Sequence, residues 1–211
     1  MQAPEAFAAR RQRVRSAIAD QVGIGVAYVV SEPANVTYLS GLQSSNAAVL
    51  IQPDGADLLC TDGRYLEMVR ALNPDLDVVD SRACAHQLVS VAMEYGCQTI
   101  AVEDAVSVTL FNELSTLARI VPVAGIVERF RRIKDDGEVA LLAQACEITA
   151  QAFQALAREI RVGQSEVHIA RRLELLFSDL GAQDRAFPSI VASGAHSAVP
   201  HHASGTRQIA V

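Results

Sequence analysis

Apolar residues in the first part of the chain fall into short runs that are separated by turn residues and by segments with helical spacing. The run Ile24–Val30 is typical of a buried strand, and it follows an arginine-rich segment with helical periodicity. Two more apolar runs, Asn46–Ile51 and Ala56–Thr61, flank the turn triplet Pro53-Asp54-Gly55, which predicts an antiparallel hairpin. The same patterns predict helices at 64–72, 85–95 and 107–118 and strands at 76–79, 99–103 and 120–123. We therefore expect an α/β domain with a mixed sheet over residues 1–127.

After a charge-rich connector, Glu128–Lys134, the pattern changes to two long amphipathic helices. Asp135 is placed to cap the first helix, and Glu138 is placed to reach back to it as in a capping box. The second helix opens at Ser165, and an extended run, Phe187–Ala192, follows it. The predicted apolar faces are Leu141, Leu142, Ala145, Ile148, Ala152, Leu156 and Ile160 in the first helix, and Val167, Ala170, Leu173, Leu176 and Phe177 in the second. The change predicts a second, incomplete α+β domain over residues 128–211.

Composition and charge exclude several classes of partner. The chain is 50% hydrophobic and 20% charged, as in globular proteins. Its net charge of -6 argues against nucleic acid, and the run Arg10–Arg15 predicts a helix with a solvated basic face instead. Asp20 and Gln21 interrupt any signal-like segment, and no run approaches the roughly 20 apolar residues that span a bilayer, so we expect no membrane partner. Four scattered cysteines predict reduced thiols and a cytoplasmic location.

The chain has no motif for a nucleotide cofactor or for covalent catalysis. Gly23 and Gly25 precede a strand and do not open a helix as a phosphate-binding loop does, and Ser193 with Gly194 does not form a nucleophile elbow. From Leu180 to Val211 the only acidic residue is Asp184, whereas a hydrolytic metal centre needs several carboxylates.

Several short motifs nevertheless stand in a definite order. The first domain contains Asn35-Val-Thr-Tyr-Leu-Ser-Gly41, Thr61-Asp-Gly-Arg-Tyr65 and Val102-Glu103. The second contains Arg132-Ile-Lys134 with Glu138, Gly163-Gln-Ser-Glu166, Phe187-Pro-Ser-Ile-Val-Ala-Ser-Gly194 and Val199-Pro-His201. Through this ordered set the chain resembles, along essentially its whole length, the creatinase, aminopeptidase P and prolidase family. In the resemblance, Asn35–Gly41 corresponds to a turn after a strand, and Thr61–Tyr65 to a junction between a strand and a helix.

The resemblance implies a creatinase-type N-terminal domain followed by the first part of a pita-bread domain. It implies an Xaa-Pro dipeptidase or aminopeptidase, in which two divalent ions (manganese, cobalt or zinc) activate water for attack on the amide before a proline. A proline-containing peptide substrate and a homodimer are implied as well. The family's metal ligands lie downstream of the Pro-His motif, so the resemblance assigns no metal ligand to this chain. We expect a truncated chain that is inactive alone.

Two residues match functional positions of the family. His201 corresponds to a histidine that faces the metal pair and helps to orient the substrate or to stabilise charge on the attacked carbonyl, a role that suits imidazole. Phe187 corresponds to a position where an aromatic residue contacts the substrate's first side chain. His196 and His202 match nothing comparable, and a solvated loop histidine is the simpler interpretation of both.

Three alternatives stay open at this point. The three histidines His196, His201 and His202 are a candidate zinc site, although no fourth ligand lies near them in sequence. The chain is alternatively a noncatalytic dimerisation or binding module of the same fold. The third alternative is a fragment of a creatinase-like amidinohydrolase.

Overall fold

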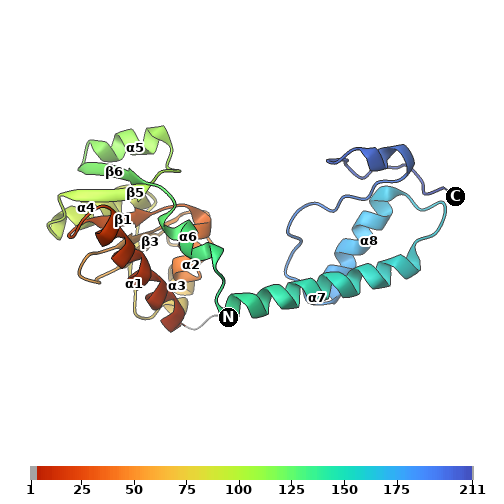
Figure 1. Ribbon diagram of the computed structural model, residues 1–211, viewed down its shortest axis with the longest axis horizontal. Helices are drawn as coiled ribbons and strands as arrows, with labels where there is room; N and C mark the ends of the chain where they lie inside the picture. Colours follow the sequence, from red (N-terminus) through yellow and green to blue (C-terminus); the bar gives the residue numbers. More distant parts are fainter. Residues whose placement is uncertain (1–3, 211) are drawn as a thin grey trace. The chain divides into compact units, whose positions relative to one another are not determined.

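The computed structural model describes residues 4–210, which form two compact units that divide between Lys134 and Asp135 (Figure 1). The helices of the first unit are α1 (Pro4–Gln21), α2 (Pro33–Ser40), α3 (Leu66–Leu72), α4 (Cys84–Glu94), α5 (Val108–Ser115) and α6 (Ile126–Arg132). Its strands are β1 (Ala27–Val30), β2 (Ala47–Ile51), β3 (Leu58–Thr61), β4 (Asp77–Asp80), β5 (Thr99–Glu103) and β6 (Arg119–Val123). The second unit contains α7 (Asp136–Glu159), α8 (Glu166–Asp179) and a 3-10 turn, η1 (Gly194–Ala198).

The first unit is built on one mixed sheet with the strand order β4-β3-β2-β1-β5-β6. β2 pairs antiparallel with both β1 and β3, whereas the pairs β1–β5, β3–β4 and β5–β6 are parallel. The hairpin predicted around Pro53-Asp54-Gly55 is therefore confirmed as β2 and β3, and so is the mixed α/β character of this domain.

Helices cover both faces of the sheet (Figure 1). One face packs against α1, α2, α3 and α6 through residues such as Val14, Leu39 and Ile126. The other packs against α4 and α5 through residues such as Leu88 and Leu114. The central strands are buried on both faces, which explains why they are continuous apolar runs in the sequence.

Two segments predicted to be irregular are helices. The motif Asn35–Gly41, expected as a turn, lies in α2, where Pro33 occupies the first helical turn and Gly41 ends the helix. Proline suits a first turn because its missing N–H would have no partner in the helix there. The connector Glu128–Lys134 is largely α6, whose apolar residues Ile126 and Val127 pack on the sheet. Both predictions were wrong because tertiary packing stabilises short helices that local sequence leaves undecided.

The sequence predicted that the arginines of α1 lie on a solvated face. This prediction was wrong for two of them. Arg10 and Arg11 are buried and donate hydrogen bonds to the carbonyl oxygens of Tyr38 and Leu39, at 3.0 and 3.1 Å. Arg11 also pairs with Asp75 at 2.7 Å. The carbonyls at the end of α2 need donors once they are buried, and these guanidinium groups supply them.

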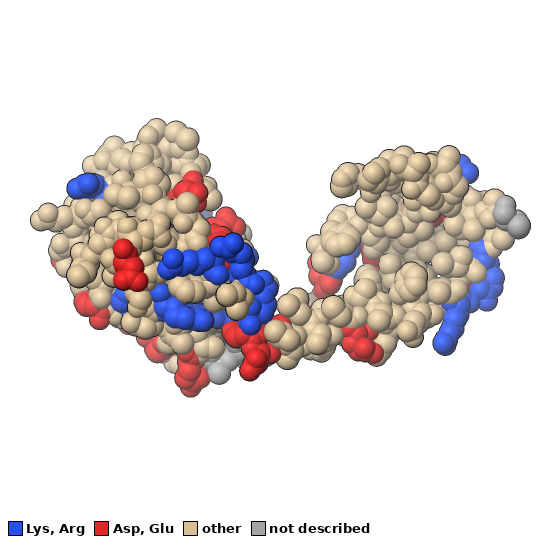
Figure 2. Space-filling model, in the orientation of Figure 1, with Lys and Arg blue, Asp and Glu red and all other residues tan. Residues whose placement is uncertain are grey.

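Basic side chains gather over α1 and α6 of the first unit (Figure 2). Arg13 and Arg129 lie over the ring of Phe130, with 5.8 and 4.9 Å between guanidinium carbon and ring centroid. Such cation–π contacts explain part of this clustering without a ligand. Within residues 4–210, no helix is both long and apolar enough to cross a membrane.

In the second unit, α7 and α8 pack against each other around Ala152, Leu156, Ile169 and Leu176. The predicted capping box is confirmed: the Asp135 side chain accepts from the Glu138 amide at 2.9 Å, and Glu138 accepts from the Asp135 amide at 3.0 Å. The Ser165 side chain accepts from the His168 amide and so caps α8, as predicted.

Two expectations for this unit are corrected. The apolar face of α7 is buried only toward its C-terminal half, because Leu141 and Leu142 are each 53% exposed and no residue among 135–210 buries them. The extended run Phe187–Ala192, which follows the two helices of the predicted α+β domain, is not a strand in the structure. An extended run becomes a strand only where a neighbour offers a ladder, and none does so here.

Candidate active site

Both residues that the sequence singled out, Phe187 and His201, border one hollow of the second unit. The hollow has a volume of about 740 Å³ and lies between α8 and the segments 185–190 and 200–204. His201 is exposed, and Phe187 is 71% exposed, so both side chains are available to a ligand. Charged walls come from Arg171, Glu174 and Arg185, with Arg185 and Glu174 paired to each other.

Next to Val167, which lines this hollow, is a buried carboxylate, Glu166, the first residue of α8. Its side chain has no exposed surface. One carboxylate oxygen accepts from the Ser193 amide at 2.8 Å and from the Ser193 hydroxyl at 3.0 Å. The other accepts from the Gly205 amide at 3.3 Å. Glu166 therefore holds together two backbone segments that are distant from it in sequence.

Two imidazoles complete the surroundings of this carboxylate. His196 Nδ1 lies 2.9 and 3.1 Å from the two oxygens of Glu166, and His202 Nε2 lies 2.8 Å from one of them. The two rings are neighbours, with centroids 4.2 Å apart. Because both ends of the segment 193–205 are bound to Glu166, the backbone on either side of His201 is fixed.

The three predicted histidines thus separate in the structure. His196 and His202 converge on Glu166, whereas His201 faces the hollow. From the sequence, Glu166 was interpreted only as part of the motif Gly163–Glu166 at the start of a helix. Its role was not recognised because its partners lie 30 and 36 residues further along the chain.

Hydrogen bonding dominates the electrostatics of Glu166. Burial alone would raise the pKa of its carboxyl group, but hydrogen bonds from His202, from the Ser193 amide and from His196 outweigh burial. The pKa therefore lies well below its ordinary value, and Glu166 is a carboxylate at neutral pH.

The residues of this site do not fit a pair of hard divalent ions. Among the described residues, Glu166, His196 and His202 are the group of ligating side chains that converges, and it offers one carboxylate. Hard ions bound in pairs need several oxygen ligands. The dinuclear centre that the family resemblance implies therefore cannot be assigned to these side chains.

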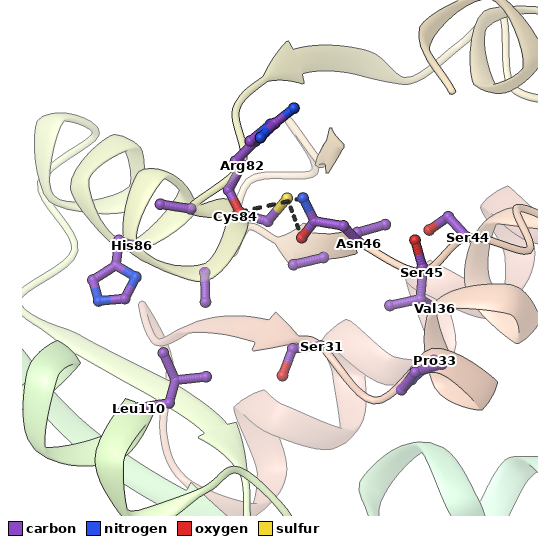
Figure 3. Close-up of a pocket in the computed structure, with 14 residues that line it drawn as sticks. Ser31, Pro33, Val36, Ser44, Ser45, Asn46, Arg82, Cys84, His86 and Leu110 are labelled. Carbon is purple, nitrogen blue, oxygen red and sulfur yellow. Dashed lines mark hydrogen bonds between the residues drawn. The ribbon is translucent and has the colours of Figure 1, made fainter. Parts of the chain in front are cut away.

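A second hollow, of about 410 Å³, lies in the first unit at the N-terminus of α4 (Figure 3). Ser31, Asn46, Cys84 and His86 border it. The Cys84 thiol points to the Asn46 side-chain oxygen, at 3.5 Å, and to the carbonyl of Ser81, at 3.2 Å. A hydrogen bond from the Cys60 thiol lowers the pKa of Cys84 from its ordinary value, and burial opposes this shift.

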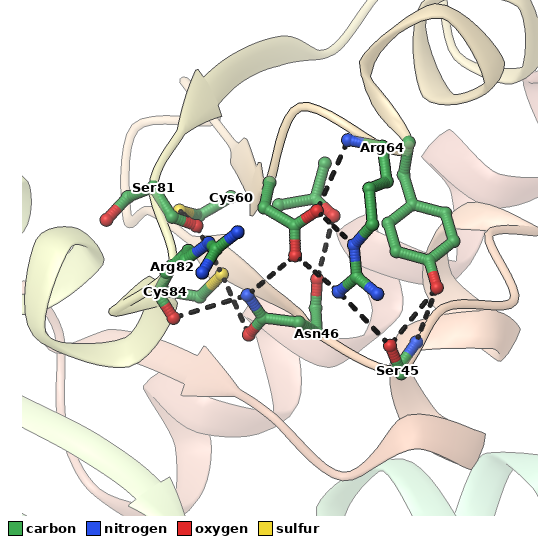
Figure 4. A network of polar contacts seen from close by, with 10 residues as sticks. Ser45, Asn46, Cys60, Arg64, Ser81, Arg82 and Cys84 are labelled. Carbon is green, nitrogen blue, oxygen red and sulfur yellow. Dashed lines mark hydrogen bonds and ion pairs between the residues drawn. The ribbon is translucent and has the colours of Figure 1, made fainter.

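Polar side chains next to this hollow bond mainly to one another (Figure 4). Asn46 donates to Asp62 at 3.1 Å and to the Arg82 carbonyl at 3.2 Å, and Arg64 Nη2 donates to Asp62 at 2.8 Å. Hydrogen bonds from Arg64 and Asn46 hold the pKa of Asp62 well below its usual range. This network joins the start of β2 to the junction between β3 and α3, which is a structural role.

Each of the two units matches a known protein family. Residues 10–133 match the Creatinase/Prolidase N-terminal domain, and residues 140–211 match Metallopeptidase family M24.

Three relatives illustrate the match. An uncharacterized peptidase of Bacillus subtilis is 29% identical over 194 residues, which are 90% of this chain and 54% of the relative. The Xaa-Pro dipeptidase of Pyrococcus furiosus is 28% identical over 184 residues, 85% of this chain and 51% of that protein. The solved Xaa-Pro dipeptidase from Bacillus anthracis superposes with a TM-score of 0.87 at 28% identity, over 96% of this chain and 57% of its own.

The chain spans about half the length of the curated relatives it matches. Over that length it matches two family models in succession and has the fold of a solved Xaa-Pro dipeptidase. The chain belongs to the creatinase, aminopeptidase P and prolidase family of metallopeptidases.

Proposed function

We propose that this chain is part of an Xaa-Pro peptidase, in which His201 and Phe187 contact the substrate at the bond preceding proline. The observation that carries the proposal is their common position on one hollow, next to backbone fixed by the buried Glu166. Relatives of this chain are Xaa-Pro dipeptidases.

In this proposal His201 donates a hydrogen bond to the carbonyl oxygen of the amide that precedes proline. Imidazole can donate from either ring nitrogen, and a donor aimed at a developing oxyanion typically contributes about 10²–10³ in kcat. Phe187 contacts the side chain before that bond. The family implies manganese, cobalt or zinc ions that activate water, and we expect their ligands outside residues 4–210.

The test is a fusion of residues 1–211 to the part of the Bacillus anthracis enzyme that follows the matched region. The fusion is assayed with Mn²⁺ or Co²⁺ on an Xaa-Pro dipeptide, on the same dipeptide with alanine in place of proline, and on creatine. We expect cleavage before proline, and we expect H201A to lower kcat by about 100-fold. F187A should mainly raise KM, roughly tenfold, through lost apolar contact.

H168A is the matched control, because His168 is exposed on α8 and does not border the hollow. Full activity of a folded H201A fusion would contradict the role of His201. Turnover of creatine in place of the dipeptide would favour the amidinohydrolase alternative. The 211-residue chain alone should cleave no Xaa-Pro dipeptide with either metal.

A noncatalytic binding module stays the second candidate, favoured by the exposed apolar residues Leu142 and Phe153 on α7. A homodimer and a cytoplasmic location are parts of the main proposal. A folded fusion that hydrolyses none of the three substrates would favour the binding module.

A further inference from the structure

The cluster of Glu166, His196 and His202 brings three atoms of metal-ligating type together. One ligand atom each from Glu166, His196 and His202 lies within 4.8 Å of the other two. The nitrogens that face the carboxylate are Nδ1 of His196 and Nε2 of His202. The three residues come from the start of α8, from η1 and from the segment after η1, so the fold creates the cluster. His196 is 37% exposed, which leaves a path from solvent.

The separations in the cluster fit a common ion. From Oε2 of Glu166, the oxygen that both rings approach, Nε2 of His202 lies 2.8 Å away and Nδ1 of His196 lies 3.1 Å away. Two ligands that are each about 2.0–2.1 Å from an ion lie roughly 2.9 Å apart at a right angle and about 3.3 Å apart at a tetrahedral angle. The observed distances match right angles, as in five- or six-coordinate geometry, and require shifts of a few tenths of an ångström for tetrahedral geometry.

The surroundings resemble the outer shell of a metal site. The Ser193 and Gly205 amides donate to Glu166 and hold its orientation, as hydrogen-bonded partners do for ligating carboxylates. Two imidazoles and one carboxylate form the ligand set of many catalytic zinc sites, in which water fills the remaining positions. Imidazole nitrogen selects Zn²⁺, Co²⁺ and Ni²⁺ over Mg²⁺ and Ca²⁺.

We propose that Glu166, His196 and His202 bind one borderline divalent cation, of the class Zn²⁺, Co²⁺ or Ni²⁺, in a mononuclear site. The ion replaces the two N–H···O hydrogen bonds by three metal–ligand bonds. No net proton loss is needed when both rings are neutral, because the proton moves from Nδ1 to Nε2 in His196 and from Nε2 to Nδ1 in His202. The bound ion fixes both ends of the segment that presents His201.

The experiment uses the metal-free 211-residue chain, titrated with Zn²⁺ by calorimetry and with Co²⁺ by visible absorption. Histidine ¹H–¹⁵N spectra identify the ligands without any substitution. We expect one ion per chain, a tautomer change in His196 and His202, and unchanged signals from His86 and His168. Mg²⁺ should leave all histidine signals unchanged.

Variants test each ligand. H196A and E166Q should each weaken Zn²⁺ binding at least about tenfold, as expected for the loss of one ligand. If E166Q does not fold, H196A and the spectra of the natural chain still decide the outcome. H201A is the matched control, since its neighbour His202 is retained, and it should bind Zn²⁺ like the natural chain.

Three results would overturn the proposal. These are the absence of saturable Zn²⁺ binding, equal affinity in H196A, and loss of binding in H201A. None of them depends on peptidase activity, so this site and the proposed function can fail separately.

Discussion

Glu103, at the end of β5, is a buried carboxyl group in the first unit, with 3% of its surface exposed. It accepts from the amides of Ser31 and Glu32, each at 2.7 Å, and from the Asn35 side chain at 2.7 Å. Burial nevertheless raises the pKa of Glu103 above its ordinary value of 4.5, since it outweighs these hydrogen bonds. The folded chain therefore binds this proton more tightly than the unfolded chain does.

Stability should consequently depend on pH through Glu103. Its contribution is fully present below about pH 4.5 and is lost as pH rises through the raised pKa of the folded state. In E103Q, which cannot titrate here, that dependence should vanish. Urea unfolding of both chains from pH 4 upward should show the advantage of the natural chain over E103Q shrinking. A difference that does not change with pH would contradict the raised pKa.

Position 41 requires glycine for two reasons, its left-handed backbone conformation and its close contact with Phe7. Its φ is 71°, and a Cβ atom there would lie 2.6 Å from Cζ of the buried Phe7 ring. We expect G41A to lower the free energy of unfolding by about 2–4 kcal/mol, from backbone strain plus overpacking. G96A is the control, because Gly96 has a φ of 89° and no atom within 4 Å of such a Cβ. In the same urea measurement, G96A should lower the free energy of unfolding by only the cost of backbone strain, about 1–2 kcal/mol.

At the scale of single elements, the start of α7 depends on its capping box. Removing the Asp135 side chain takes an acceptor from the Glu138 amide, and N-caps typically contribute about 1 kcal/mol. D135A should therefore increase hydrogen exchange in the first turn of α7 by about fivefold, without changing exchange in α4. D135N keeps an acceptor and is the control. Equal exchange in D135A and the natural chain would mean that packing alone holds this turn.

The feature that bears on association between chains is an exposed apolar stripe on α7. Val139, Leu142, Cys146 and Phe153 share it by helical periodicity, and Leu142 and Phe153 are 53% and 66% exposed. Exposed apolar patches promote association. We expect the chain to elute as a dimer or larger species in sizing chromatography, and mild oxidation to join two chains through Cys146.

Substitutions on the stripe should reverse this association. F153E should shift the chain toward monomer and reduce the Cys146 cross-link. M93E, which changes an exposed residue of α4 in the first unit, should change neither. A natural chain that stays monomeric at all concentrations would contradict this prediction.

Local signals predicted most elements of the fold. The triplet Pro53-Asp54-Gly55 identified the β2–β3 hairpin, and the predicted strand 99–103 coincides with β5. Asp135 and Ser165 identified the starts of α7 and α8, since a cap and its amide lie within three residues. The motif Asn35–Gly41 was expected as a turn, whereas it lies in α2 with Pro33 in the first helical turn.

The candidate site was predictable only in part. His201 and Phe187 were found through the family resemblance, and the hollow that unites them is a property of the folded chain. Glu166 was not recognised, because a carboxylate at a helix start is fully explained by capping and the helix dipole.

The amino-acid sequence was enough to predict the periodicity of the elements, their caps, the family and the absence of a run long enough to span a bilayer. These properties depend on neighbours in the chain, so they can be read residue by residue. Three features became known from the folded chain: Arg10 and Arg11 are buried, Leu141 and Leu142 near the start of α7 are exposed, and Glu166 meets His196 and His202. Each of these depends on which distant segment covers a side chain, and that is decided by packing of the whole unit.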